Sequence, residues 1–427
     1  MRKFLLLIFL LPALFSSITV ISTEKDFVLD EEEKYHFTST TYGRYYDSIP
    51  TNPNAYEETP TFTDSTLSKT AGKLVPDQPI QITGFYVNEE EVPIFKLKNG
   101  QFVIADKNTI YEDTVQSIED IHQEMWLKPG FTLYDKANIN GAKKINATVA
   151  PYTKVSIVQI VQTVKGTYAQ IEGQGWVSME FLAATDNRID KVQEILSSKY
   201  NKADYSIYVK QLDTGKEAGI NQDQEMYSAS VTKLPYLYYV QEQLDQKKLS
   251  LDQKFKYIGA VNDFAGAYEP EGSGSIAKSA DDKEYSVQDL INRVAKESDN
   301  VAHNILGYYA TNQSDKNFQQ TINKIAGKKW DVEERQASSR MAGNVLEAIY
   351  EQNGMIIDAL SQTNYDNQRI SKNIDAKVAH KIGDAYDFKH DAAIVYADSP
   401  FIIVIFTNNS NYDNISQIAD DVYGVLK

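Results

Sequence analysis

The strongest constraint on the fold is an alternation of helical and strand patterns that begins near Asn187 and continues to the C-terminus. Apolar residues recur at helix spacing in two stretches, and three further stretches have the pattern of strands. The helical stretches are 189–196 and 415–425, and the strand stretches are 205–212, 392–397 and 401–407. A helix, strands, several helices, more strands and a final helix predict an α/β (α+β) domain, an antiparallel sheet flanked by helices.

The length and composition exclude several classes of protein. A chain of 427 residues predicts two or three domains, and a hydrophobic content of 42% is enough for packed cores. The formal net charge of −16 disfavours nucleic acid as a partner. The chain has no cysteine, which excludes disulfides and cysteine-based sites, and no two of its five histidines form an H-x-x-x-H pair. We therefore expect no metal and no cofactor.

The N-terminus predicts export. Arg2 and Lys3 precede an apolar run over 4–15 that continues more weakly to Ile21. A short basic start followed by a long apolar body is typical of a secretory signal. The run is also just long enough for an uncleaved membrane anchor, so residues 1–22 are either a signal peptide or an anchor. Both alternatives place the rest of the chain outside the cytoplasm and limit membrane contact to this segment.

Two regions separate this segment from the C-terminal domain. Residues 23–77 are acidic, rich in Thr, Tyr, Ser and Pro, and lack a sustained apolar period, which predicts an extended linker. Short alternating runs divided by turn residues over 78–185 predict a small all-β region of two units. Its Gly175-Trp176-Val177 segment resembles the GW-type bacterial SH3-like modules, which often attach to cell walls. A small barrel that serves only as a spacer is the alternative.

Ser230 and Lys233 form the first motif that carries chemistry. They lie three residues apart at the start of a helical pattern, so their side chains share one face of the helix. A serine hydroxyl needs an adjacent base to act as a nucleophile, and a desolvated lysine can serve as that base. Alone, an S-x-x-K motif is common by chance, and a serine at this position is often only a helix cap.

Two further motifs follow in the order expected for one enzyme family. They are Ser298-Asp299-Asn300, between two helical patterns, and Lys381-Ile382-Gly383, just before the paired C-terminal strands. With S-x-x-K they make residues 187–427 resemble the class A β-lactamases and the penicillin-binding transpeptidases and carboxypeptidases. The resemblance implies a β-lactamase/transpeptidase-like fold and a mechanism through an acyl-enzyme.

The resemblance also assigns roles to individual residues. It implies that Ser230 is the nucleophile, Lys233 its general base, and Ser298 the hydroxyl that relays a proton to the leaving group. Substrate-binding roles fall on Asn300, Lys381, Gly383 and Asp384, and the oxyanion hole on the backbone N–H groups of Ser230 and Asp384. His303 and His380 are expected to be packing residues.

Departures from the family pattern affect substrate preference and turnover. Ile382 replaces a hydroxyl that would hold a substrate carboxylate, and Asp384 adds a negative charge nearby. We therefore expect substrates with a free amine, such as D-alanyl esters of teichoic acid, to be preferred over carboxylate-ended peptides. The segment 330–339 lacks the deacylating E-x-x-N pattern, and Glu333 or Glu334 would have to replace it.

Three functions remain open from the sequence. The leading one is a cell-wall-associated serine hydrolase from a Gram-positive bacterium that acts on peptidoglycan or teichoic acid and is acylated by β-lactams. The second is a true β-lactamase, which the missing glutamate disfavours. The third is a pseudoenzyme that binds wall polymer or a divisome partner and would keep its function in a Ser230→Ala variant.

Overall fold

The computed structural model describes residues 43–427, so the predicted signal or anchor segment and the first part of the predicted linker lie outside the described residues. The chain divides into two compact units. Of the described residues, the first holds 43–120, 133–145 and 159–170, and the second holds 121–132, 146–158 and 171–427. Within 43–427, no helix combines the length and the apolar character needed to cross a bilayer.

The first unit contains strands where the sequence predicted a linker. A five-stranded sheet has the order β3-β2-β6-β5-β4, and β1 pairs with β7. Their bounds are β1 (Pro53–Ala55), β2 (Thr59–Phe62), β3 (Thr70–Leu74), β4 (Ile82–Val87), β5 (Pro93–Leu97), β6 (Phe102–Ile104) and β7 (Ile110–Glu112). The boundary expected at residue 78 is therefore wrong, because β2 and β3 belong to the same sheet as β4 to β6. They were missed because β3 is an edge strand exposed over its first four residues, which leaves no apolar period to read.

The remaining N-terminal strands lie over 115–183. They are β8 (Val115–Leu127), β9 (Leu133–Tyr134), β10 (Lys144–Ile145), β11 (Lys154–Thr163), β12 (Gly166–Ile171), β13 (Gly175–Ser178) and β14 (Leu182–Ala183), and a short 3-10 helix η1 (Met179–Phe181) precedes β14. An all-β region was expected here. Its assignment as a pair of SH3-like modules stays a prediction.

Residues 187–427 fold around a five-stranded antiparallel sheet of order β16-β15-β23-β22-β21. Its strands are β15 (Tyr205–Gln211), β16 (Glu217–Ile220), β21 (Lys377–Ala385), β22 (Phe388–Tyr396) and β23 (Phe401–Asn408). Short pairs outside this sheet are β17 (Glu225–Tyr227) with β20 (Gln336–Ser338), and β18 (Lys254–Lys256) with β19 (Glu284–Ser286). The predicted antiparallel sheet flanked by helices is confirmed for this part of the chain.

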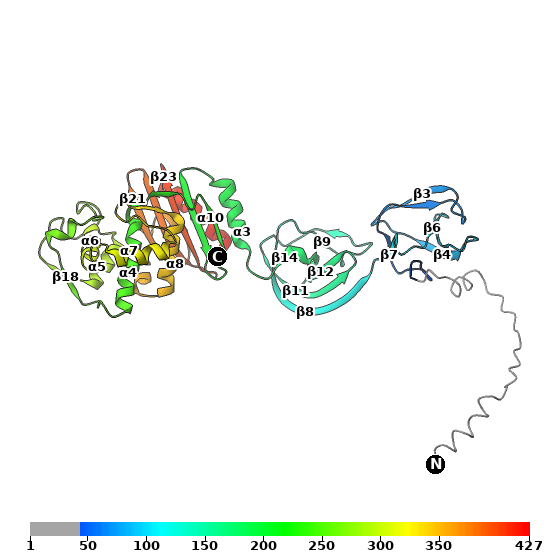
Figure 1. Cartoon of the computed structure of the whole chain (residues 1–427), viewed down its shortest axis with the longest axis horizontal. Helices are drawn as coiled ribbons and strands as arrows, with labels where there is room; N and C mark the ends of the chain where they lie inside the picture. The colour runs from blue at the N-terminus through cyan, green and yellow to red at the C-terminus, as the bar shows by residue number, and fades with distance from the viewer. Residues whose placement is uncertain (1–42) are drawn as a thin grey trace, which may run out of the picture. The chain divides into compact units, whose positions relative to one another are not determined.

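Helices cover both faces of the sheet (Figure 1). They are α3 (Arg188–Lys199), α4 (Lys233–Asp245), α5 (Val287–Lys296), α6 (Asn300–Tyr309), α7 (Lys316–Ala326), α8 (Ser339–Gln352), α9 (Met355–Leu360) and α10 (Tyr412–Leu426). Alternate residues of a strand point to opposite faces, so Ile402 and Val404 pack in the core with α4 to α9, while Ile403 and Ile405 pack in the core with α3 and α10. The strand pattern over 401–407 is therefore continuously apolar because both of its faces are buried.

Candidate active site

Ser230 lies in a short 3-10 helix, η2 (Ala229–Thr232), and Lys233 is the first residue of the α-helix α4 that follows. Ser230 is half-buried, whereas Lys233 is fully buried. Ala229, just before Ser230, has a φ of 48°, a left-handed conformation that is uncommon for a residue with a side chain. The sharp turn at Ala229 leaves the serine at the surface and sends the lysine inward.

Lys233 contacts three oxygens of the second motif. Its Nζ donates to the carbonyl oxygen of Ser298 and to Oδ1 of Asn300, both at 2.7 Å, and lies 3.3 Å from Ser298 Oγ. The carbonyl and amide oxygens can only accept, so they take the two N–H groups of a neutral amine. The lone pair of that amine is then free to accept a proton from a hydroxyl.

Ser298 also contacts the lysine of the third motif. Lys381 Nζ lies 2.8 Å from Ser298 Oγ and 2.9 Å from the carbonyl oxygen of Ile382. The buried Ser298 hydroxyl therefore lies within hydrogen-bond reach of both lysine nitrogens. A hydroxyl in this position can pass a proton between two nitrogens, and its relay of a proton to the leaving group stays a prediction.

The environment lowers the pKa of both lysines. Burial, and then the charge of Lys381, lowers the pKa of Lys233 well below its usual value. Burial lowers the pKa of Lys381 to about 7, although the charge of Asp391 opposes that shift. A lysine with a lowered pKa can act as a general base at neutral pH, as the predicted mechanism requires.

The third motif lies on β21, the edge strand of the sheet, close to the turn that carries Ser230. A Cβ added to Gly383 would lie 2.8 Å from the carbonyl oxygen of Ser228 and 3.1 Å from a methyl group of Val231. Only a residue without a side chain lets the strand approach this closely. Gly383 thus sets the spacing between the third motif and the serine turn.

Asp384 does not present a free negative charge. Its Oδ2 accepts from the buried Arg369 at 2.6 Å and from the hydroxyl of Tyr412, and its Oδ1 accepts from Lys389 at 2.9 Å. Two cations therefore balance its charge. The expectation that Asp384 attracts an ammonium group from the substrate loses its basis, because it treated the carboxylate as unpaired.

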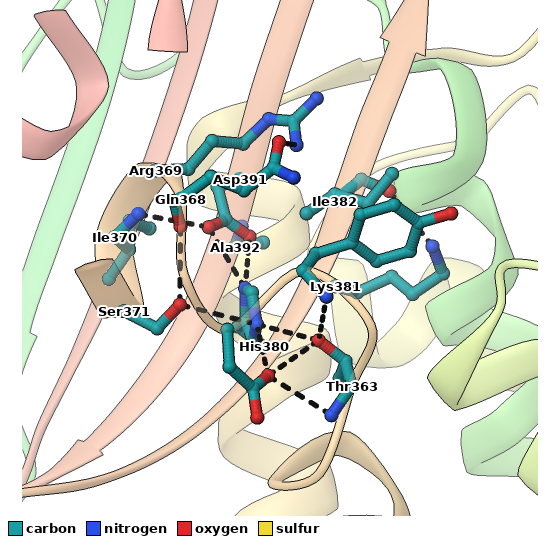
Figure 2. Close-up of polar contacts among 12 residues, drawn as sticks. Thr363, Gln368, Arg369, Ile370, Ser371, His380, Lys381, Ile382, Asp391 and Ala392 are labelled. Carbon is teal, nitrogen blue, oxygen red and sulfur yellow. Dashed lines mark hydrogen bonds and ion pairs between the residues drawn. The ribbon is translucent and has the colours of Figure 1, made fainter. Parts of the chain in front are cut away.

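His380 is buried next to Lys381 and joins an ion-paired network instead of simple packing (Figure 2). Its Nδ1 lies 3.0 Å from both oxygens of Asp391, and its Nε2 lies 3.1 Å from Asp366 and 3.0 Å from the hydroxyl of Thr363. Burial alone would lower the pKa of His380, but the charge of Asp391 and the bonds to the two carboxylates raise it to about 9. His380 is therefore a charged residue that ties the segment before β21 to the sheet.

His303 contrasts with His380. Its ring packs against those of Tyr236 and Tyr268, with centroid distances of 4.2 and 4.8 Å, and neither ring nitrogen has a hydrogen-bond partner among the described residues. Burial, and then the charge of Lys233, lowers the pKa of His303 well below its usual value. His303 is neutral and packs in the core, as the sequence predicted.

The segment 330–339 brings a cation to the site instead of a carboxylate. Glu333 and Glu334 are exposed. Arg335 turns inward: its Nη2 donates to the carbonyl oxygens of Gly266 and Ala267 at 3.2 and 3.0 Å, and its guanidinium lies 4.0 Å from the centroid of the Tyr268 ring. Neither glutamate is placed as the deacylating base that the sequence left open.

Tyr268 and Asn304 are site residues that sequence reasoning missed. Tyr268 is buried beside Lys233, and Asn304 holds the backbone of Tyr268 by accepting from its N–H at 2.8 Å and donating to its carbonyl at 2.7 Å. The one available signal was the position of Asn304, four residues after Asn300 on the same helix, which places both amides on one face. Tyr268 lies in an irregular loop, where no periodic pattern marks it.

The fold and the geometry of the three motifs define a domain with a β-lactamase-like serine-hydrolase fold. The family model described as the beta-lactamase enzyme family matches residues 187–426, more than half of the chain, and the chain belongs to that family. No curated protein sequence matches it.

Several solved structures match the chain over 56% of its length. They include PBP-A (17% identity, 56% of this chain and 95% of that chain, TM-score 0.47) and a β-lactamase from Chitinophaga pinensis (20%, 56% and 100%, TM-score 0.46). A point mutant of PBP-A in an acyl-enzyme complex with penicillin G matches at 17% identity, 56% of this chain and 95% of that chain, with a TM-score of 0.46.

Proposed function

We propose that the chain is an exported, cell-wall-associated serine hydrolase or acyltransferase that works through an acyl-enzyme on Ser230. The observation that carries this proposal is the set of contacts made by Lys233, whose nitrogen meets two acceptor oxygens at 2.7 Å and the Ser298 hydroxyl at 3.3 Å. A buried lysine held in this way, one helical turn after a half-buried serine, is equipped to take the serine proton.

The proposed acylation has three proton transfers. Ser230 Oγ attacks the substrate carbonyl carbon while Lys233 Nζ takes its proton, and the carbonyl oxygen becomes an oxyanion held by the backbone N–H groups of Ser230 and Asp384. When the bond to the leaving group breaks, Ser298 donates its hydroxyl proton to that group. Ser298 recovers a proton from one of the two lysines that contact its oxygen.

The charges around the site support an acyl substrate that carries an anionic group. Lys381, Arg335 and Lys278 all act on Lys233 as nearby positive charges, and Asp299 is the opposing negative charge. Asp299 is also engaged, because its carboxylate accepts from the backbone N–H groups of Ser275, Ile276 and Ala302. Asp384 is paired with Arg369 and Lys389, so Arg335 and Lys278 are left as positive charges near Lys233 against Asp299, and these charges favour an anionic group.

We propose wall polymer as the substrate class, because it agrees both with the charges at the site and with the export that the N-terminal sequence predicts. The basic start and the apolar run over 4–21 predict that the domain works outside the cytoplasm. Peptidoglycan and teichoic acid are anionic acyl-bearing polymers found there in Gram-positive bacteria. SH3-like modules within the N-terminal all-β region would hold the domain on the wall.

β-Lactams are proposed as acylating agents and not as efficiently hydrolysed substrates. Lys233 contacts Ser298 and follows Ser230 by three residues, whereas in the segment 330–339 Arg335 turns inward and Glu333 and Glu334 are exposed. Without a base to activate water, an acyl-enzyme would be released slowly. This disfavours the function of a true β-lactamase.

A fluorophosphonate or activated ester probe tests the proposal. The wild-type chain should be labelled on Ser230, and a Lys233→Ala variant should react about a hundredfold more slowly because its base is gone. A Lys199→Ala variant, which removes an exposed lysine paired with Asp421, should react like the wild type. Unlabelled wild-type protein would favour the pseudoenzyme, whose cellular function would survive in a Ser230→Ala variant.

A further inference from the structure

Tyr268 places one buried aromatic ring beside the amine of Lys233 and the guanidinium of Arg335. Lys233 Nζ lies 4.3 Å from the ring centroid and the guanidinium carbon of Arg335 lies 4.0 Å from it. Both distances are within the range of a cation–π interaction, which strengthens where water is excluded. The ring is thus a shared contact of the predicted base and of the cation from the segment 330–339.

The hydroxyl of Tyr268 reaches the serine turn. It donates to the carbonyl oxygen of Ala229 at 2.9 Å, the residue that precedes Ser230 and has a φ of 48°. A left-handed residue other than glycine costs free energy and persists where its surroundings hold it. The Tyr268 hydroxyl supplies one such contact, on the peptide group that leads into the nucleophile.

The loop around Tyr268 is itself anchored to the second motif. Asn304 bonds both the N–H and the carbonyl of Tyr268, and the carbonyl oxygen of Glu269 accepts from Asn300 Nδ2 at 2.8 Å. A single residue therefore touches the base and the serine turn, while its backbone is fixed to the helix that begins at Asn300.

We propose that Tyr268 is a positioning residue, which holds Lys233 through its ring and the Ala229 carbonyl through its hydroxyl, so that base and nucleophile stay aligned for acylation. This inference rests on the proposed function, because it assigns a role within the same reaction.

The two parts of the side chain have separable effects. The electron-rich ring favours the charged form of Lys233, so losing the ring lowers the pKa of that lysine. Other titratable groups face Lys233 from the elements packed against it, and their charges are separate from the effect of the ring. They are Lys381 on β21, Asp299 and His303 at α6, Arg335 before β20, and Lys278 in the loop before β19. Losing only the hydroxyl leaves this balance of charge unchanged.

The test compares Tyr268→Phe with Tyr268→Leu in the full chain. The measurement is the rate at which an activated ester acylates Ser230, as a function of pH. Tyr268→Phe should react about fivefold more slowly, because the hydrogen bond to Ala229 is lost. The acid limb, which is the range of low pH where the rate rises as Lys233 loses its proton, should lie at the same pH as in the wild type. Tyr268→Leu should move the acid limb to lower pH by about half a unit to one unit, because more of Lys233 is neutral there.

A matched control removes a different buried tyrosine hydroxyl. Tyr208 donates to Glu217 at 2.7 Å in the core of the same domain, and Tyr208→Phe should leave both the rate and the profile as in the wild type. Tyr268→Met supplies a second side chain without a ring if Tyr268→Leu does not fold.

Two results would overturn the inference: wild-type rates in Tyr268→Phe, or an acid limb that stays in place when the ring is removed. Either leaves the wild type reactive, so it differs from a failure of the proposed function, in which the wild type itself is not acylated.

Discussion

The side-chain nitrogen of Lys381 lies 2.8 Å from the hydroxyl oxygen of Ser298, and Lys233 approaches that oxygen from the first motif at 3.3 Å. One hydroxyl therefore connects the two buried lysines. Without it, neither lysine could exchange a proton with a leaving group through Ser298.

Replacing this hydroxyl should slow acylation more than it affects folding. Ser298→Ala keeps the carbonyl oxygen that holds Lys233 but removes the hydroxyl, and with it the relay and the contacts of that hydroxyl with both lysines. We expect the rate of acylation by an activated ester to fall about a hundredfold. Ser361→Ala, which removes a hydroxyl bonded to the carbonyl of Ile357, serves as the control. A Ser298→Ala rate within about twofold of that control would rule out the relay.

Gly383 should tolerate no side chain. A Cβ there would meet the Ser228 carbonyl at 2.8 Å, so alanine forces β21 away from the serine turn. A displacement of this kind lowers acylation by about a hundredfold. Gly424 on α10 has open space where an added methyl group would lie, so Gly424→Ala should keep full activity and gain a little stability. Equal rates in the two variants would show that the close approach of strand and turn is unimportant.

The ion pair of Asp384 should contribute to stability, not to amine recognition. Asp384→Asn leaves Arg369 buried without its carboxylate, and we expect a loss of about 1–3 kcal/mol in the free energy of unfolding by urea. Asp413→Asn breaks an exposed pair with Lys372 and should cost less than about 1 kcal/mol. A selective loss of activity on amine-bearing esters in Asp384→Asn would instead restore the expectation that this residue recognises an ammonium group.

The charge of His380 should make stability depend on pH. Its pKa is about 9 in the folded chain and 6.5 in the reference state, so its contribution is complete below pH 6.5 and is lost as pH rises through 9. The difference in Tm between the wild type and His380→Asn should therefore shrink across this window. Lys381 has the opposite sign, since its pKa falls from 10.5 to about 7, but it is present in both proteins. A difference in Tm that stays constant from pH 6.5 to 9 would contradict the ion-paired role of His380.

The sequence predicted the parts of the site that are marked by helix and strand boundaries. Ser230, Ser298 and Lys381 each lie beside a strong apolar period, so their motifs could be placed on elements and then brought together. Contacts made by irregular loops could not be read in this way. Tyr268 is held by side-chain bonds to Asn304, and the partner of Asp384 is Arg369, fifteen residues earlier in a short 3-10 helix, η4 (Arg369–Asn373).

The lack of a periodic pattern also explains why the sequence predicted a linker where the N-terminal region has the strand β3. Leu74 is the only buried residue of β3, so no period of two distinguishes that strand from a linker. What defines β3 as a strand is its pairing with β2, in the sheet that also holds β4 to β6. Apolar alternation does not define it.

The measurement that tests the central claim most directly is the intact mass of the chain during and after exposure to penicillin G. The account predicts a mass increase of one intact penicillin, located on the peptide that contains Ser230, which persists after the free antibiotic is removed because Arg335 occupies the segment where a deacylating carboxylate is needed. Ser230→Ala should show no increase. A wild-type chain that gains no mass with penicillin or with an activated ester, or a Ser230→Ala variant that gains the same adduct, would contradict the acyl-enzyme on Ser230.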